Sequence, residues 1–372
     1  MIHVVPKAEE AWGSRPAKQV GEASAGKLYR LPHVVLFAIP ASLAGANSYR
    51  SVHAFIEVHL SHLRRIFGLT WRKAPAHTTI RWILQQLDPA SVEHALRAHA
   101  AALARQAKGA GHHVAIDGKA LRGSFDNFED RKAAHVLSAF APGLALTLAH
   151  LDCGEKSNEI PAVQDLVAVL GLPGAQIRVD AMQTFKAATG AGHHLIAQVK
   201  DNQPTLLQAV AAHCGRIKPR DSVRTIDEGR LRDETRTYEV FALDKVLEGS
   251  DWKDHVAAVI RVTRQTNTRS AATGLWRRSR EISYYVCDVV VSAERAAHAI
   301  RHHWGIENRL HYVRDGSFAE DASRIRKNPA IFARLRSFAL NILRFNKVEN
   351  IAAARYRIAI GGIAALRSIR FL

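Results

Sequence analysis

The chain has 372 residues, and 52 lysines and arginines against 34 acidic residues give it a formal net charge of +18. With 47% hydrophobic and 23% charged residues, the composition is that of a folded protein with a buried core and excludes a disordered basic tail. A chain of this length allows two or three domains. Because fixed positive charge attracts phosphates, the sequence favours a polyanionic partner, and nucleic acid is the leading candidate.

No part of the sequence is long and apolar enough to cross a membrane. The longest apolar run, residues 31–46, contains two prolines and falls short of the roughly 20 residues that a spanning helix needs. Residues 1–19 lack the apolar core of a secretory signal. The three cysteines, Cys153, Cys214 and Cys287, form no metal-binding or redox pair in the sequence. We therefore expect no membrane partner, a protein that stays inside the cell, and reduced cysteines.

Helical patterns dominate the first part of the chain. Residues 1–27 are polar and rich in small residues, which is typical of a loosely ordered leader. Over residues 28–110, apolar residues recur at helical spacing and predict several short helices, with one long helix after Asp88 and Pro89. This N-terminal helical domain is a candidate for DNA binding. Its candidate contacts are Arg64, Arg65, Arg72 and Lys73.

Strand patterns begin near residue 111. Apolar runs predict strands at 113–117, 134–140 and 144–151, and a helix, strand, helix, strand, helix series follows. Three strands followed by alternating helices and strands are the order of a ribonuclease H-like fold, which is an α/β mixed sheet with flanking helices. We expect one such domain over residues 111–372.

A β-rich insertion interrupts this domain before its last helices. At about residues 217–291, three further strand-like runs are separated by polar and basic turns. From Glu294 onward the pattern is helical and strongly basic. Asn328 and Pro329 predict the N-cap and the first turn of a helix that ends near Phe345.

Two aspartates end predicted strands, where an open sheet forms its reactive crevice. Asp117 follows the apolar Val114 and Ile116, and Asp180 follows a strand that ends at Val179. For Asp117 alone, capping of the next turn and a functional role are about equally good interpretations. Two acids at the ends of neighbouring strands favour a shared divalent cation.

A third carboxylate, Glu307, lies in a segment with a helical pattern. On a helix, His303 four residues before it and Arg314 seven residues after it would lie on the same face. A carboxylate flanked by cationic groups suits binding of a metal and a phosphate. The alternative is an amphipathic surface helix with ordinary ion pairs.

Several runs of the sequence, in the same order, resemble the H-repeat-associated (ISAs-type) insertion-sequence transposases. They are residues 115–124 (AIDGKALRGS), 155–161 (EKSNEIP), 179–182 (VDAM), 202–205 (NQPT) and 303–308 (HWGIEN), followed by Leu310-His311 and Glu320-Asp321. The resemblance covers the chain from about Leu31.

The resemblance implies a DDE transposase with a ribonuclease H-like core, whose catalytic and metal-binding triad is Asp117, Asp180 and Glu307. It implies two Mg²⁺ or Mn²⁺ ions, cleavage of double-stranded DNA at terminal inverted repeats, and transfer of the freed 3′ ends to target DNA. A homodimer would bring two ends together on DNA, in the bacterial cytoplasm at the nucleoid. The first alternative is a catalytically decayed or recruited relative that only binds specific DNA, and the second is a metal-dependent nuclease without strand transfer.

Further residues would contact the DNA. In related transposases an Arg commonly precedes the glutamate by four residues and a Lys follows it by seven, and His303 and Arg314 occupy these places here. Lys119 and Arg122 follow Asp117 closely enough to contact phosphates, and Trp276 in the insertion could stack on an unpaired base. Ordinary surface charge is the alternative for the basic residues, and a core or edge position is the alternative for Trp276.

Overall fold

The computed structural model describes residues 28–106, 113–129, 131–153, 159–170, 176–179, 194–229, 231–243, 246–366 and 369. The predicted leader at 1–27 lies outside this part of the chain. None of the described helices is long and apolar enough to span a membrane. By their contacts, the described residues form two units. One unit combines those of 1–110, 118–162 and 307–372, and the other combines those of 111–117 and 163–306.

Nine strands in the described part of the chain form a sheet in the order β3-β2-β1-β4-β5-β9-β8-β7-β6. They are β1 (His113–Ala120), β2 (His135–Ala141), β3 (Leu146–Cys153), β4 (Gln176–Val179), β5 (His194–Val199), β6 (Asp221–Gly229), β7 (Arg232–Ala242), β8 (Ala258–Arg269) and β9 (Trp276–Cys287). Strand β4 pairs in parallel with β1 and β5, whereas β2–β3 and all pairs from β5–β9 to β6–β7 are antiparallel. This confirms the predicted mixed sheet of a ribonuclease H-like α/β fold.

Helices precede, interrupt and follow the strands. They are α2 (Leu31–Leu43), α3 (Tyr49–Val58), α4 (Leu60–Phe67), α5 (His77–Gln85), α6 (Pro89–Gln106), α7 (Glu159–Leu170), α9 (Pro204–Arg216), α10 (Ala293–Gly305), α11 (Tyr312–Gly316), α12 (Pro329–Phe345) and α13 (Ile351–Leu366). Helix α6 begins where the Asp88-Pro89 pair predicts it. The Asp88 carboxylate accepts hydrogen bonds from the backbone N–H groups of Ala90 and Ser91, at 3.2 and 3.0 Å, and satisfies donors that a helix start leaves unpaired.

Helix α12 is buried along most of its length and packs against α2, α6 and β3. Its Asn341 side chain both accepts from the backbone N–H of Thr147 and donates to the Thr147 carbonyl, each at 2.8 Å. These bonds satisfy polar groups that burial would otherwise leave unpaired. Because α12 contacts both the N-terminal helices and β3, the contacts do not separate the chain at 110, where the predicted domains 28–110 and 111–372 meet.

The start of α12 differs from the prediction in one respect. Pro329 occupies the first turn as expected, but the side chain of Asn328 makes no capping hydrogen bond. The backbone of Asn328 is left-handed, with φ of 53°, and its Nδ2 instead donates to the carbonyl of Leu87 at 3.0 Å. Asn328 therefore occupies the predicted N-cap position without capping the helix through its side chain, which instead joins the start of α12 to the turn before α6.

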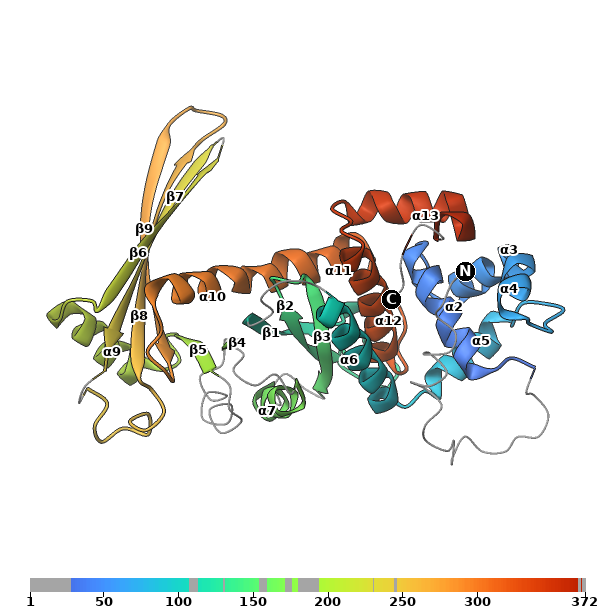
Figure 1. Ribbon diagram of the computed structural model, residues 1–372, viewed down its shortest axis with the longest axis horizontal. Coiled ribbons are helices and arrows are strands. Elements are labelled where there is room, and N and C mark those ends of the chain that lie inside the picture. Colours follow the sequence, from blue (N-terminus) through green and yellow to red (C-terminus); the bar gives the residue numbers. More distant parts are fainter. Residues whose placement is uncertain are drawn as a thin grey trace. The chain divides into compact units, whose positions relative to one another are not determined.

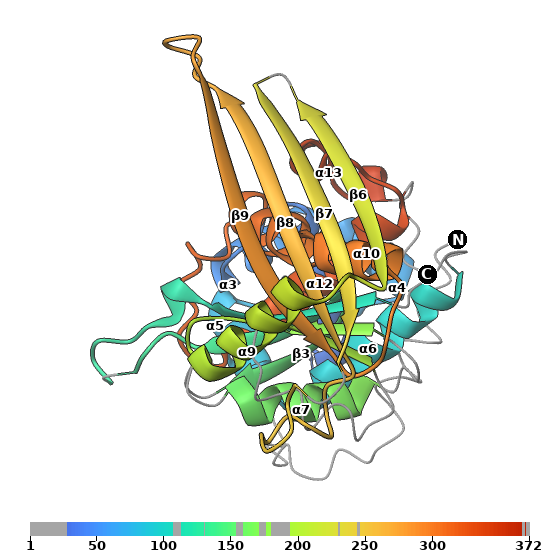
Figure 2. The same cartoon turned by 90° about the vertical axis from the view of Figure 1, so that its left-hand side faces the viewer.

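The insertion predicted at about 217–291 consists of four antiparallel strands, β6 to β9. Three of them correspond to the predicted runs, and the sequence did not reveal β6. That strand, DSVRTIDEG, carries few apolar residues because it is an edge strand with mostly exposed side chains. Figure 2 shows β6 to β9 side by side over their length.

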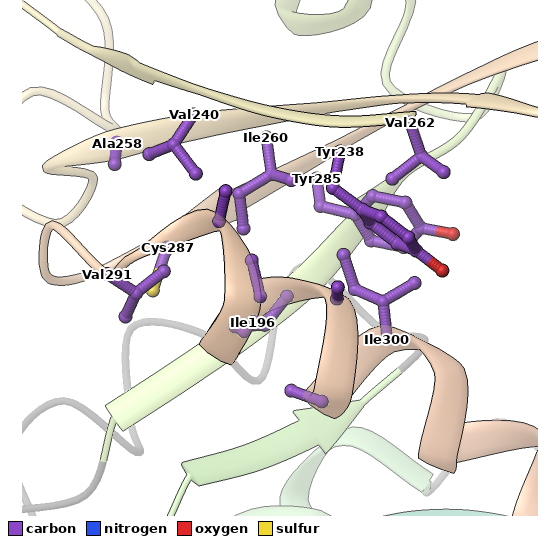
Figure 3. Packing of buried hydrophobic residues seen from close by; sticks show 14 residues of the cluster. Ile196, Tyr238, Val240, Ala258, Ile260, Val262, Tyr285, Cys287, Val291 and Ile300 are labelled. Carbon is purple, nitrogen blue, oxygen red and sulfur yellow. The ribbon is translucent and has the colours of Figure 1, made fainter. Parts of the chain in front are cut away.

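One face of the insertion is covered by α10, and a hydrophobic core lies between them (Figure 3). Tyr238, Val240, Ile260 and Tyr285 contribute from the strands, and Ile300 contributes from the helix. Burial of this apolar surface is what holds α10 against the sheet.

We predict that Ile260→Ala lowers the free energy of unfolding by about 2–5 kcal/mol, because a large apolar side chain with no exposed surface would leave a cavity. The matched control is Ile226→Ala on β6, where the isoleucine is 58% exposed and the expected change is within about 0.5 kcal/mol. Urea unfolding followed by circular dichroism measures both. Equal losses of stability in the two variants would contradict this account of the core.

Candidate active site

Glu307 lies in a π-helical segment, Ile306–His311, between α10 and α11. Such segments are rare and occur frequently at functional sites. The Glu307 side chain is 59% exposed, and its Oε2 lies 3.4 Å from Nδ1 of His311, which is 5% exposed. The segment therefore presents a carboxylate and an imidazole one turn apart.

Asp117 is a half-buried residue of β1. It lies in the unit that holds residues 111–117, whereas Glu307 and His311 lie in the other unit. Carboxylates are the ligands that Mg²⁺ and Mn²⁺ prefer, and an imidazole nitrogen is a ligand type typical of transition metals. The donor set fits a divalent cation.

Asp117 and Glu307, two of the three residues predicted as a triad, lie in described parts of the chain, and their shared role stays a prediction. Asp180 lies outside the described residues, so its predicted role stays a prediction. His303 lies on α10, and the structure does not describe its side chain. Sequence reasoning did not identify His311 as a ligand. The available signal was its spacing of four residues from Glu307, which places two side chains side by side on a helix.

Lys119 and Arg314, both predicted to contact phosphates, enter a buried ionic network instead. Its centre is Glu320, which is fully buried and lies 2.7 Å from Nη2 of Arg314, 3.4 Å from Nη1 of Arg336 and 3.7 Å from Nζ of Lys119. Lys119 also contacts Asp315, and its Nζ lies 3.6 Å from Oδ1 of Asp321. These two cations bind protein carboxylates in the structure.

The prediction that Arg314 shares the face of Glu307 is wrong. Arg314 is 1% exposed, whereas the Glu307 side chain is 59% exposed. Seven residues complete two turns in an α-helix, but the intervening π-helical segment has wider turns and rotates the later residue away. As a result, the side chain of Arg314 points into the interior, where it contacts Glu320.

Gly123 has a structural reason to be a glycine in the run 115–124. A Cβ added there would lie 2.3 Å from the carbonyl oxygen of Ser323 and 2.8 Å from that of Asp321, so only glycine permits this approach of two backbone segments. The neighbouring Arg122 is 82% exposed, with its Nε 3.7 Å from Oδ2 of Asp321. Arg122 is therefore accessible for the predicted contact with phosphates, and that role stays a prediction.

The remaining predicted DNA contacts lie on exposed positions. Arg64 and Arg65 are in the last turns of α4, and Arg72 and Lys73 follow it in the chain; all four are exposed. Trp276 is 56% exposed at the start of β9, so its alternative as a core residue is excluded. The structure leaves these side chains accessible, and their DNA contacts stay predictions.

Glu320 is ionised in spite of its burial. Burial by itself would raise the pKa of this carboxyl, but Arg314, Arg336 and Lys119 together hold the pKa below its ordinary value of 4.5. A group whose pKa is lowered by folding stabilises the folded state at higher pH, and this stabilisation is lost as the pH falls through the pKa of the folded state.

We predict that Glu320→Gln lowers the free energy of unfolding at pH 7 by about 3–5 kcal/mol, because it leaves buried cations without a counter-charge. The variant should also lose less stability than the wild type when the pH is lowered below 4.5. Urea unfolding at a series of pH values tests both effects, with the exposed Glu248→Gln as the control. A variant with the stability and pH profile of the wild type would contradict this role for the network.

Comparison with known proteins adds to this geometry. Residues 22–100 match the family described as DDE_Tnp_1-associated, and residues 109–343 match the Transposase DDE domain. The H repeat-associated putative transposase YhhI of Escherichia coli K12 is 28% identical over 343 residues, which cover 86% of this chain and 86% of that protein. The putative transposase YncI of Escherichia coli O157:H7 is 29% identical over 341 residues, which cover 85% and 82%.

Among solved structures, that of the piggyBac transposase synaptic complex with hairpin DNA has a TM-score of 0.36 and 10% identity to this chain, and the match covers 96% of this chain and 77% of that one. This likeness is too weak to bear on function. The family match spans both Asp117 and Glu307, and the resemblance to H-repeat-associated transposases is confirmed. This chain belongs to the Transposase DDE domain family.

Proposed function

We propose that this chain is an insertion-sequence transposase that binds the terminal inverted repeats of its element, cuts the DNA with Mg²⁺ or Mn²⁺, and joins the 3′ ends to target DNA. The observation that carries the proposal is the match of residues 109–343 to the Transposase DDE domain, which spans Asp117, Asp180 and Glu307. Carboxylates from distant parts of a sequence are suited to hold a divalent cation.

Asp180 is the third acid of the proposed triad, and the register of the sheet supports it. Strand β1 pairs in parallel with β4, so that His113 lies opposite Gln176 and Ala115 opposite Arg178. Asp117 and Asp180 each follow two residues after the last of these pairs. Equal spacing along two neighbouring parallel strands is the pattern expected of two acids that share metal ions.

The proposed residues have separate roles. Asp117, Asp180 and Glu307 would hold the cations, with His311 beside Glu307. Bound there, a pair of divalent cations would supply an activated nucleophile and stabilise the leaving oxygen. The protein's own contribution is to fix the ligands and position the phosphate, so one site would serve both cleavage and strand transfer.

The proposed partner is double-stranded DNA, both at the element's ends and at the target. The net charge of +18 favours it, as do the exposed basic residues Arg64, Arg65, Arg72 and Lys73. We infer that a homodimer holds two ends together during transfer, because two ends must be joined to one target.

We predict that Mn²⁺ binding depends on the proposed ligands. Isothermal titration should show binding to the wild type and its absence or strong weakening in Asp117→Asn, Asp180→Asn and Glu307→Gln, because each variant removes an anionic ligand. The controls are Glu248→Gln and Asp254→Asn, which change exposed acids of the insertion. Unchanged binding in any one of the three variants would remove that residue from the triad. A wild type that binds DNA but no Mn²⁺ would favour the decayed or recruited DNA-binding protein.

We also predict that the purified protein nicks and joins a labelled terminal-repeat duplex only with a divalent cation. Asp117→Asn, Asp180→Asn and Glu307→Gln should each lose activity by about three or more orders of magnitude, because the three carboxylates act as one unit. Gel analysis separates nicked from joined products. Nicking without joined products would favour a metal-dependent nuclease, and full activity in any of the three variants would contradict the proposed mechanism.

A further inference from the structure

The insertion has two faces of different chemistry. Tyr285 and Cys287 of β9 pack against α10 with Ile260 of β8, so these residues define an inner face. Side chains alternate between the faces of a strand, so Arg278 and Arg280 of β9 point to the opposite, outer face. The register places Arg280 opposite Gln265 of β8.

The β8–β9 part of the outer face carries cationic, amide and aromatic side chains. Across the two strands the register pairs Gln265 with Arg280, Asn267 with Arg278, and Arg269 with Trp276. We call these six residues the outer β8–β9 surface. Every residue of β9 from Trp276 to Ile282 is exposed. In Figures 1 and 2 this end of the strands extends past α9 and α10, two helices of the same unit.

On the inner face, the arginines of β7 and β8 pair with carboxylates. Arg232, Arg236 and Arg264 surround the buried Glu234, with N···O distances of 2.6, 2.6 and 3.2 Å. Arg264 also lies 3.4 Å from Glu281. The positive charge of these three arginines is therefore largely balanced within the protein.

On the outer face, the arginines of β8 and β9 farthest from the core lack this compensation. Within the described residues, Arg278 and Arg280 form no ion pair, and the side chain of Arg269 donates from Nε to the carbonyl of Gly274, at 3.1 Å. The nearest acids of the same face, Glu228 and Asp233, lie on β6 and β7, away from β9. An uncompensated cationic surface favours an anionic partner.

We propose that the outer β8–β9 surface binds duplex DNA. This inference rests on the proposed function, from which it takes DNA as the partner. It adds which part of the fold contacts the DNA. Strands β8 and β9 are neighbours in a four-stranded antiparallel sheet, and β-sheets are among the elements that dock on DNA through outward-pointing side chains. Arginine, asparagine and glutamine are the side chains that hydrogen-bond to phosphates and to the base edges exposed there, and Trp276 lies beside them with an exposed ring.

The test compares Arg278→Gln and Arg280→Gln with Arg277→Gln. Arg277 is also exposed and is adjacent to Arg278 in β9, so each single variant removes the same charge from the same strand. The side chain of Arg277, however, belongs to the inner face. All three arginines lie in an exposed stretch, and circular dichroism and urea unfolding should show folding like that of the wild type. Fluorescence anisotropy with a labelled duplex in EDTA, at several salt concentrations, measures binding without the catalytic reaction.

We expect the double variant Arg278→Gln/Arg280→Gln to bind about tenfold or more weakly, and the slope of log affinity against log salt to fall by about 1 for each phosphate that the variant no longer binds. Arg277→Gln should bind like the wild type. Equal weakening in Arg277→Gln would show an effect of net charge alone and would overturn the proposal, as would unchanged binding in the double variant. A change of oligomeric state on sedimentation with unchanged DNA binding would also overturn it and assign the surface to a second copy of this chain.

This experiment separates the inference from the proposed transposase activity. A wild type that binds the duplex through Arg278 and Arg280 but fails to cut terminal repeats would contradict the activity and support the surface. A wild type that cuts and joins DNA, with a double variant that does so at equal efficiency at every DNA concentration, would contradict the surface and support the activity.

Discussion

The buried carboxylate of Glu320 is the constraint on which the surroundings of the candidate site depend. It is fully buried, and Arg314, Arg336 and Lys119 lie around it, so none of these charges can be removed without leaving another uncompensated. Lys119 follows Asp117 by two residues, and Arg314 follows His311 by three. The same ion network therefore restrains the segments that follow Asp117 and His311, which is how a fold can fix residues that are distant in sequence.

The π-helical segment Ile306–His311 explains why so much of the site lies within a few residues. A regular α-helix would return Arg314 to the face of Glu307, and a buried arginine would then have to sit beside an exposed carboxylate. The wider turns resolve this conflict by sending the two side chains in different directions. One short segment thus supplies an exposed acid and a buried imidazole, and it directs the cation that follows into the interior.

The sequence predicted those features that depend on repeated patterns. Alternation and helical spacing located the sheet and most helices, and the apolar run before Asp117 located β1, although the strand continues past Asp117 to Ala120. Features that depend on non-repeating geometry could not be predicted from the sequence. A π-helical turn has no sequence period, so the direction of Arg314 and the pairing of Glu307 with His311 did not follow from spacing counted on an α-helix. Strand β6 has few apolar residues, and Asn328 meets the carbonyl of Leu87 only because distant segments pack together.

Net charge is the sequence property whose interpretation depends most on the structure. The value of +18 predicts a polyanionic partner but does not say which cations are available to it. Arg314, Arg334 and Arg336 are each no more than 2% exposed, and each is paired with a buried or partly buried carboxylate. Arg232, Arg236 and Arg264 of the inner face of the insertion are paired as well. An anionic partner therefore meets only the cations that remain unpaired, and where these gather on one face, as Arg278 and Arg280 do, a general attraction can become a defined orientation.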